Sequence, residues 1–254
     1  MSGALKTYQS VWERKPVLRT IYDDFYRRLA AECVPGLTIE IGSGIGSLKK
    51  RLGNVVTTDV QHAPWLDCVA DAQKLPFAEG IASNIVMVDV LHHIEFPAIF
   101  FREAERVLKP GGRILMVEPA ITWGSTLFYR FLHHEPVRTS TNPLGIGTPY
   151  PKRNPYDSNQ AIPTMIATRY RNAFHWQFPD LQITRVDWFS FAVYPLSGGF
   201  RPWGLIPQGL VEPLLAVERK VEGTLGRHAG FRMMLIIEKR STPCEIPKPD
   251  KPPT

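Results

Sequence analysis

The stretch Thr38–Gly46, which reads TIEIGSGIG, constrains the fold of this chain more than any other. Its first half is typical of the end of a buried strand, and Gly42, Gly44 and Gly46 then alternate with other residues. No side chain would keep a ligand from the backbone of such a turn, close to the start of a helix that we expect over Ser47–Leu52. The stretch therefore predicts a strand, a ligand-binding turn and a helix, although many purely structural turns are also rich in glycine.

The spacing of the glycines and the acidic residue before them indicate the charge of the ligand. The dinucleotide fingerprint is G-x-G-x-x-G, whereas this run is G-x-G-x-G and follows Glu40. A carboxylate beside the turn would repel a pyrophosphate and would favour a cation. The pattern thus favours S-adenosylmethionine, which carries a sulfonium and an amino group, over a nicotinamide dinucleotide.

Four further motifs follow the glycine turn and support one family. Together with IEIGSGIG, in this order and at this spacing, they resemble the class I S-adenosylmethionine-dependent methyltransferases. The resemblance implies an α/β fold: a Rossmann-like, doubly wound, mostly parallel seven-stranded sheet with an antiparallel last strand and an inserted substrate lid. The motifs are TTDV (57–60), ADAQKLPF (70–77), NIVMVDVLHHI (84–94) and ERVLKPGGRILMVEP (105–119).

The same resemblance implies which residues bind the cofactor. An acidic residue at the end of the second strand would hold the ribose, and the acid of the ADAQ motif would meet the adenine amine. The residues after the fourth strand would lie along the cofactor. The expected cofactor-binding residues are Glu40, Gly42, Ser43, Gly44, Gly46, Asp59, Val60, Asp71, Ala72, Asp89 and Val90. Each acidic residue could instead be an ordinary turn or cap residue.

Hydrophobic periodicity and helix-ending signals predict the regular elements. We expect Lys109–Gly112 to form a tight turn before the fifth strand. The expected helices are Pro16–Val34, Pro97–Leu108, Met165–Phe178 and Leu214–Leu225, with a short one around Trp123–Leu132. The expected strands are Leu37–Ile41, Val55–Thr58, Leu66–Ala70, Ile85–Val88, Arg113–Val117, Gln182–Tyr194 and Phe231–Glu238.

A length of 254 residues accommodates one domain with a sizeable insertion. We expect a single methyltransferase domain over residues 1–240. The segment of about 120–163 is too long for an ordinary connection, and in the resembling family this position commonly holds the substrate lid. Residues 241–254 are rich in proline and lysine and are expected to be disordered.

Methyl transfer to an alcohol needs a general base, most often histidine or a carboxylate. We expect the base among His93, His133 and His134, with His92, Glu118 and Glu135 as further candidates. One residue of the pair His92–His93 is expected to be structural. No third ligand stands at a spacing typical of a metal site, so we expect no metal.

Aromatic residues in the insertion and apolar loops over Pro195–Pro213 predict a bulky, partly apolar acceptor, either a small molecule or a lipid-linked one, methylated at oxygen. With a net charge of +6, peripheral contact with an anionic membrane is conceivable, although these residues could also pack on the core or on a second subunit. No basic tract interleaved with aromatics is present, so we expect no nucleic-acid partner. Three widely spaced cysteines and a mixed, polar N-terminus are typical of a cytoplasmic protein.

Other functions remain compatible with these motifs. One alternative is a module that binds S-adenosylmethionine without catalysis, because the sequence does not single out a base. A C-methyltransferase acting on an apolar metabolite is another alternative. A nicotinamide-dependent oxidoreductase is disfavoured by Glu40 and by the spacing of the glycines.

Overall fold

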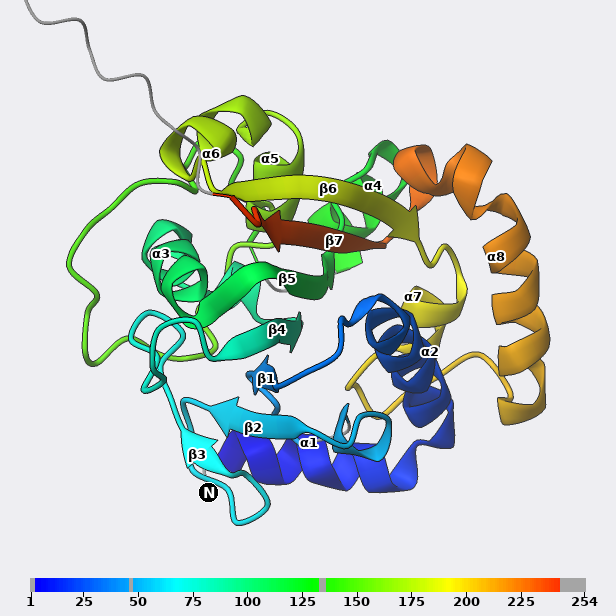
Figure 1. Ribbon diagram of the computed structural model, residues 1–254. Coiled ribbons are helices and arrows are strands. Elements are labelled where there is room, and N and C mark those ends of the chain that lie inside the picture. Colours follow the sequence, from blue (N-terminus) through cyan, green and yellow to red (C-terminus); the bar gives the residue numbers. More distant parts are fainter. Residues whose placement is uncertain (1–2, 46–47, 133–135, 243–254) are drawn as a thin grey trace, which may run out of the picture.

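A seven-stranded sheet forms the centre of the computed structural model, which describes residues 3–45, 48–132 and 136–242 (Figure 1). The strand order is β3-β2-β1-β4-β5-β7-β6. Strands β1 to β5 are parallel, whereas β7 runs antiparallel between β5 and β6. The expected Rossmann-like sheet with an antiparallel last strand is therefore confirmed. The strands are β1 Thr38–Ile41, β2 Val55–Asp59, β3 Cys68–Val69, β4 Ala82–Val88, β5 Leu108–Pro119, β6 Leu181–Phe189 and β7 Arg232–Lys239.

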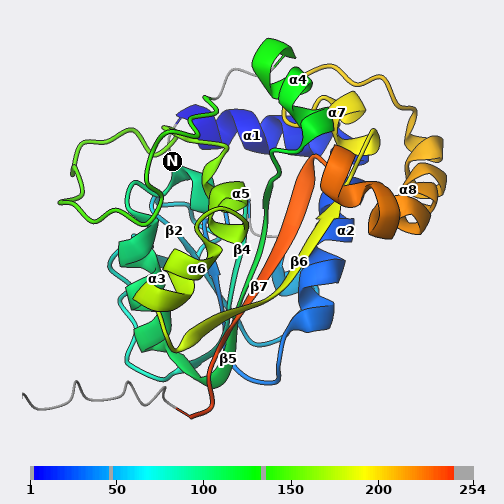
Figure 2. The same cartoon turned by 90° about the horizontal axis from the view of Figure 1, so that it is seen from above.

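Helices cover both faces of this sheet. Figure 2 shows α3, α5 and α6 on one face, α2 and α8 on the other, and α1 and α4 across one end of the strands. The α-helices are α1 Gly3–Arg14, α2 Pro16–Glu32, α3 Pro97–Val107, α4 Trp123–Leu132, α5 Ile162–Ala167, α6 Arg171–Gln177, α7 Val193–Ser197 and α8 Gln208–Ala229. Two short 3₁₀ turns are η1 Leu48–Lys50 and η2 Leu91–His93.

Successive side chains of the central strand β4 enter two different hydrophobic cores. Ile85 and Met87 pack with Phe101 of α3, whereas Val86 packs with Phe25 of α2. Because strand side chains alternate between faces, burial on both sides fixes the register of the parallel strands. The carboxyl ends of β1, β2, β4 and β5 therefore meet at one edge, and the loops after them face a common space.

The expected tight turn at Lys109–Gly112 is wrong as a separate element, because these residues lie inside β5. Leu108 pairs with Ala82, whereas Arg113 pairs with Asn84, so the four residues oppose a single residue of β4. The chain still bends there, since the third of the four, a glycine, has φ +76°. The bend is thus a bulge within the strand.

The expected helix Met165–Phe178 is divided into α5 and α6. Thr168, the residue after α5, has φ −121° and ψ −91°, which is not helical. The break allows the two short helices to pack separately, and the ring of Phe174 in α6 lies 4.9 Å from that of Phe101, centroid to centroid. Tertiary packing thus outweighs a continuous helical pattern.

The expected strand Gln182–Tyr194 is too long. Pairing with β7 stops at Phe189, and Ser190 takes a left-handed conformation with φ 60°. The chain then turns into α7. After the glycine turn the described residues form only the 3₁₀ turn η1 instead of the expected helix, and Ser47 lies outside the described residues.

Helix α1 is an element that we did not expect from the sequence. Leu5, Tyr8 and Trp12 recur at helical spacing in this stretch, and Leu5 is buried. This periodicity was a usable signal, but the polar residues between these positions obscured it.

The segment 136–161 contains no helix or strand and packs on the end of β4. The backbone N–H of Asn159 donates to the carbonyl of His92, over 2.8 Å. Arg153 donates to the carbonyls of His93 and Asp157. The expected disordered tail lies outside the described residues from position 243 onward. Within the described ranges, no helix has the length and apolar character that crossing a bilayer requires.

Candidate active site

A cavity of about 1050 Å³ opens at the carboxyl ends of the parallel strands. A volume of this size exceeds the usual range for one drug-sized ligand, so it can hold a cofactor and an acceptor together. Of the residues expected at the site, the cavity is lined by Gly42, Ser43, Gly44, Asp59, Val60, Asp71, Ala72, Asp89, Val90 and His93. Gly46, His133 and His134 lie outside the described residues.

The glycine turn after β1 approaches the loop after β4 so closely that no side chain would fit. Gly42 has φ +65°, and a Cβ atom there would lie 2.3 Å from Cγ2 of Val90. Gly44 also has a left-handed backbone, with φ +50°. The backbone N–H of Ser43 donates to the carbonyl of Thr58, which ties the turn to β2. The turn is therefore a fixed, open stretch of backbone along the cavity wall.

Asp59 ends β2 directly beside this turn. Its carboxylate accepts hydrogen bonds from the backbone N–H of Gly44, over 3.1 Å, and of Gln61, over 2.9 Å. Burial raises the pKa of Asp59, and these backbone donors oppose the shift. A carboxylate has about four acceptor sites, so Asp59 keeps acceptor capacity for a hydroxyl group.

Glu40 lies beneath the turn and does not line the cavity. Its side chain is buried, and one of its oxygens, Oε2, has no hydrogen-bond partner. Burial raises its pKa to about 7, and hydrogen bonds from Ser43 and Tyr26 oppose this shift less strongly. An incompletely satisfied buried carboxylate favours a cation nearby.

The expected adenine end of the site is more open. Asp71 is exposed, and its carboxylate accepts from the backbone N–H of Gln73, over 2.8 Å. Val60 exposes half of its surface, and Ala72 is buried. An apolar side chain and a carboxylate at a cavity edge can contact the face and the amine of a purine.

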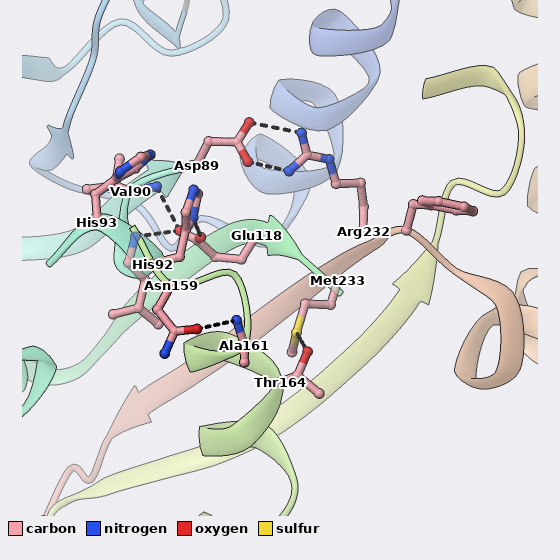
Figure 3. A network of polar contacts seen from close by, with 12 residues as sticks. Asp89, Val90, His92, His93, Glu118, Asn159, Ala161, Thr164, Arg232 and Met233 are labelled. Carbon is pink, nitrogen blue, oxygen red and sulfur yellow. Dashed lines mark hydrogen bonds and ion pairs between the residues drawn. The ribbon is translucent and has the colours of Figure 1, made fainter. Parts of the chain in front are cut away.

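Asp89 follows β4 and lines the cavity, and Figure 3 shows its side chain directed toward Arg232. It has φ 59°, which is strained for a residue other than glycine. Arg232, at the start of β7, pairs with both carboxylate oxygens, and the hydroxyl of Tyr22 in α2 donates to Oδ2 over 2.8 Å. Burial alone would raise the pKa of Asp89, but the charges of Arg232 and His92 and the bond from Tyr22 lower it.

His92 and Glu118 form a buried pair beside Asp89 (Figure 3). Nδ1 of His92 lies 2.6 Å from Oε2 of Glu118, and the other carboxylate oxygen accepts from the backbone N–H groups of Val90 and Leu91. His92 also lines the cavity. Because the carboxylate accepts from Nδ1, the basic lone pair of the neutral ring is on Nε2.

His93 is less enclosed than its neighbour. The two rings lie 4.1 Å apart, centroid to centroid, and Nδ1 of His93 is 3.3 Å from the carbonyl of Asp157. Burial and the contact with Glu118 thus distinguish two histidines that the sequence does not.

Asp89, His92 and Glu118 come close enough together that their ligand atoms could reach one ion. The contacts of the group disfavour this interpretation. Glu118 accepts three hydrogen bonds, and Asp89 is paired with the Arg232 guanidinium, whose charge would repel a cation. The group is a hydrogen-bonded network.

Many residues of the remaining wall of the cavity are aromatic. On α1, the ring of Tyr8 lies 5.0 Å from that of Phe200 and 5.9 Å from that of Tyr156, centroid to centroid. Arg232 stacks over Tyr194 at 3.9 Å. The aromatic residues of this wall are Tyr8, Trp12, Tyr22, Tyr26, Phe128, Tyr129, Tyr150, Tyr156, Tyr194, Phe200, Trp203 and Phe231.

Comparisons with known proteins agree with this geometry. A possible histamine N-methyltransferase from Thermotoga maritima is 12% identical, with a TM-score of 0.54 over 88% of this chain and 92% of that chain. A methyltransferase from Archaeoglobus fulgidus is 11% identical, with a TM-score of 0.51 over 87% and 94%. At such identities the likeness shows the fold. A search of curated proteins found no match.

The family model described as methyltransferase domain matches residues 39–116, which carry the glycine turn, Asp59, Asp71 and Asp89. The chain therefore contains a methyltransferase domain over these residues. Its cofactor is S-adenosylmethionine.

The methyltransferase has a site that suits this cofactor. The turn at Gly42 leaves room for a ligand on the backbone, and the buried Glu40 carboxylate with its unpartnered oxygen lies beneath it. Asp59 keeps acceptor capacity for hydroxyl groups. The backbone, the carboxylates and the apolar edge match a ligand with a ribose, a purine and positive charge.

Sequence reasoning missed Arg232 and the partnership of Tyr22 with Asp89. The sequence predicts only that Tyr22 lies in a helix and Arg232 in a strand. A signal was present at Arg232, because a lone charged residue begins the strongly apolar stretch RMMLII. Such a buried charge requires a partner, although the sequence does not say which one.

Proposed function

We propose that this methyltransferase transfers the methyl group to a hydroxyl oxygen of an apolar acceptor, either a small molecule or a lipid-linked one. The observation that carries the proposal is the His92–Glu118 pair. It combines a 2.6 Å contact, burial of both side chains and a place in the cavity lining. Transfer to a hydroxyl needs a base, whereas an amine or a stabilised carbanion needs less help.

S-adenosylmethionine supplies the methyl group when it is bound. Gly42, Ser43 and Gly44 would hold it along the turn, with Asp59 at the ribose and Asp71 at the purine. The protein must then place the acceptor oxygen about 3–3.5 Å from the methyl carbon and in line with the bond that breaks.

His92 would remove the proton from that oxygen. Glu118 fixes the ring, because its carboxylate accepts from Nδ1 while backbone N–H groups hold the carboxylate itself. The proton moves from the acceptor oxygen to Nε2, and the carboxylate then stabilises the imidazolium. Since His92 is 3% exposed, bulk water has little access to the base. In this proposal the general base is His92 and not one of the other candidates His93, His133 and His134.

The aromatic wall supports an acceptor with a large apolar body. Tyr8, Tyr156 and Phe200 bring together α1, the segment 136–161 and the loop after α7.

We propose that residues 120–163 act as the substrate lid within a single domain of residues 1–240. Cys33 and Cys68 are free thiols, which supports our proposal of a reducing, cytoplasmic setting.

A transfer assay tests the proposal. The protein is incubated with ¹³C-methyl-labelled cofactor and either metabolite extracts or a panel of phenols, alcohols, amines and isoprenoids. We expect a methoxy product from the wild type, its loss in His92→Gln and its retention in the neighbouring control His93→Gln. N-methyl or C-methyl products, or equal losses in both variants, would contradict the proposal. Tight cofactor binding with no product from any acceptor would favour the non-catalytic module.

A further inference from the structure

An exposed apolar ridge runs over the loop before α8 and along this helix. We define it as Trp203, Leu205, Leu210, Leu214 and Val217, which are 43%, 71%, 52%, 38% and 58% exposed. Single exposed apolar residues are ordinary, but five of them over fifteen positions of one segment are not.

The ridge follows from the pattern of α8. Leu210, Leu214 and Val217 recur at i, i+4 and i+7 and share one face of the helix. The adjacent face carries Val211 and Leu215, which are buried in the core that contains α2. Helix α8 is thus apolar over two neighbouring faces, and only one of them packs against the protein.

The ridge is continuous with the acceptor wall. Trp203 belongs to the ridge and also lines the cavity. The ammonium group of Lys15 donates to the carbonyls of Gly199, Arg201 and Trp203, at 2.7, 2.9 and 2.8 Å. These bonds hold the loop that joins the cavity to the ridge.

The charges beside the ridge are positive. Lys220 and Arg227 are exposed and form no ion pair with a described residue, whereas Glu218 accepts from backbone N–H groups and Glu222 pairs with Arg28. The remaining acid of the helix, Glu212, lies in a small cleft with Arg19, Lys50 and Asp23, and Asp23 pairs with Arg51. With a net charge of +6 for the chain, this flank complements an anionic surface.

We propose that this ridge docks the methyltransferase on the surface of an anionic lipid bilayer. The apolar side chains would enter the interface while Lys220 and Arg227 meet lipid headgroups. Trp203 then places the cavity wall at the membrane, and the entry of a lipid-linked acceptor by this route rests on the proposed function. A second copy fits less well, because a two-fold interface through this face would bring like charges together.

Vesicle co-sedimentation tests the docking with the full chain. The probes are phosphatidylcholine vesicles with and without about one quarter phosphatidylglycerol. We expect binding to the anionic vesicles, a loss of about tenfold or more in Leu205→Glu/Leu210→Glu, and a loss of about fivefold for each of Lys220→Gln and Arg227→Gln. The matched control is Trp176→Glu, which changes a residue of α6 that is 86% exposed and should bind as the wild type does.

Three outcomes would overturn the proposal. The first is no binding to anionic vesicles, and the second is an equal loss of binding in the ridge variant and the control. The third is a dimeric mass by light scattering that becomes monomeric in the ridge variant, which would assign the ridge to a second copy. Cofactor titration of the same variants should match the wild type, so failure of docking and failure of the proposed function are distinguishable.

Discussion

The two halves of the cavity are built in different ways. The proposed cofactor half consists of turns that follow β1, β2, β3 and β4, and its residues come from a short stretch of the chain, 42–90. The acceptor half consists of side chains from α1, α2, α4, the 149–156 loop, the region from α7 to Trp203 and the start of β7. The donor site is therefore local and set by the backbone, whereas the acceptor site exists only after distant elements pack together.

This difference predicts which property of the protein each substitution should change. Changes in the turns should weaken cofactor binding and leave the proton transfer intact. Changes at His92 should impair the proton transfer and leave cofactor binding intact. Changes at Asp89, which lies between the halves, should lower the stability of the fold.

The largest effect is expected for His92→Ala. Loss of a positioned general base should lower kcat by about 10²- to 10⁴-fold, while the cofactor Kd stays within error of the wild-type value. Steady-state kinetics measure kcat, and calorimetry on the same preparation measures the cofactor Kd. Should the cofactor Kd rise as steeply as kcat falls, the separation of the two halves would be wrong.

Asp89→Ala should be the most destabilising change. It leaves the Arg232 guanidinium, which is 2% exposed, without its carboxylate, and removal of one partner from a buried pair costs about 3–5 kcal/mol. Urea unfolding measures this free energy. The control Asp89→Asn tolerates the left-handed backbone and keeps an acceptor for Tyr22, so it should lose less. A loss below about 1 kcal/mol in Asp89→Ala would show that the pair is not structural.

Glu40→Gln should separate stability from binding. The pKa of Glu40 in the folded protein is about 7, above its ordinary value, so its stabilising effect is present at low pH and is lost between about pH 4.5 and 7. The variant should match the wild type near pH 4.5 and exceed its stability by up to roughly 3 kcal/mol at pH 8. It should also bind the cationic cofactor more weakly at pH 8. Unfolding curves at both pH values test the predicted stability, and calorimetry at pH 8 tests the predicted binding. If the variant and the wild type were equally stable at both pH values, Glu40 would lie in a more polar environment.

Asp59→Ala should have the smallest effect of the four. Loss of hydrogen bonds to a charged acceptor should weaken cofactor binding by about 1–3 kcal/mol, or about 5- to 150-fold in Kd. Calorimetry gives the value directly, and the substitution Lys74→Ala, at an exposed position outside the cavity lining, serves as a control. An unchanged Kd for Asp59→Ala would show that this carboxylate does not bind the ribose.

Which features could be predicted from the sequence depends on the same division between local turns and contacts of distant elements. The sheet could be predicted, and so could the place of most expected cofactor-binding residues along the cavity, because strand periodicity and the glycine turn are local patterns. The pairing of Asp89 with Arg232 spans 143 positions, and no local pattern announces it. The choice of His92 over His93 depends on the carboxylate at the end of β5, which only the folded sheet brings into contact.

Some elements were mispredicted for related reasons. The break at Thr168 and the end of β6 at Phe189 depend on what packs against them, and the hydrophobic period continues past both points. Helix α1 was missed although its period was present, because the polar residues between its apolar positions obscured the pattern. Its Tyr8 packs on Tyr156 and Phe200, and its Trp12 packs on Tyr22 of α2.

Calorimetric titration of the wild-type protein with S-adenosylmethionine tests the central claim most directly. We predict saturable binding of one cofactor per chain well below millimolar concentration, with NADH giving no heat under the same conditions. Absence of S-adenosylmethionine binding at millimolar concentration, or binding of NADH in its place, would contradict the assignment of the turn after β1 to a cationic nucleoside.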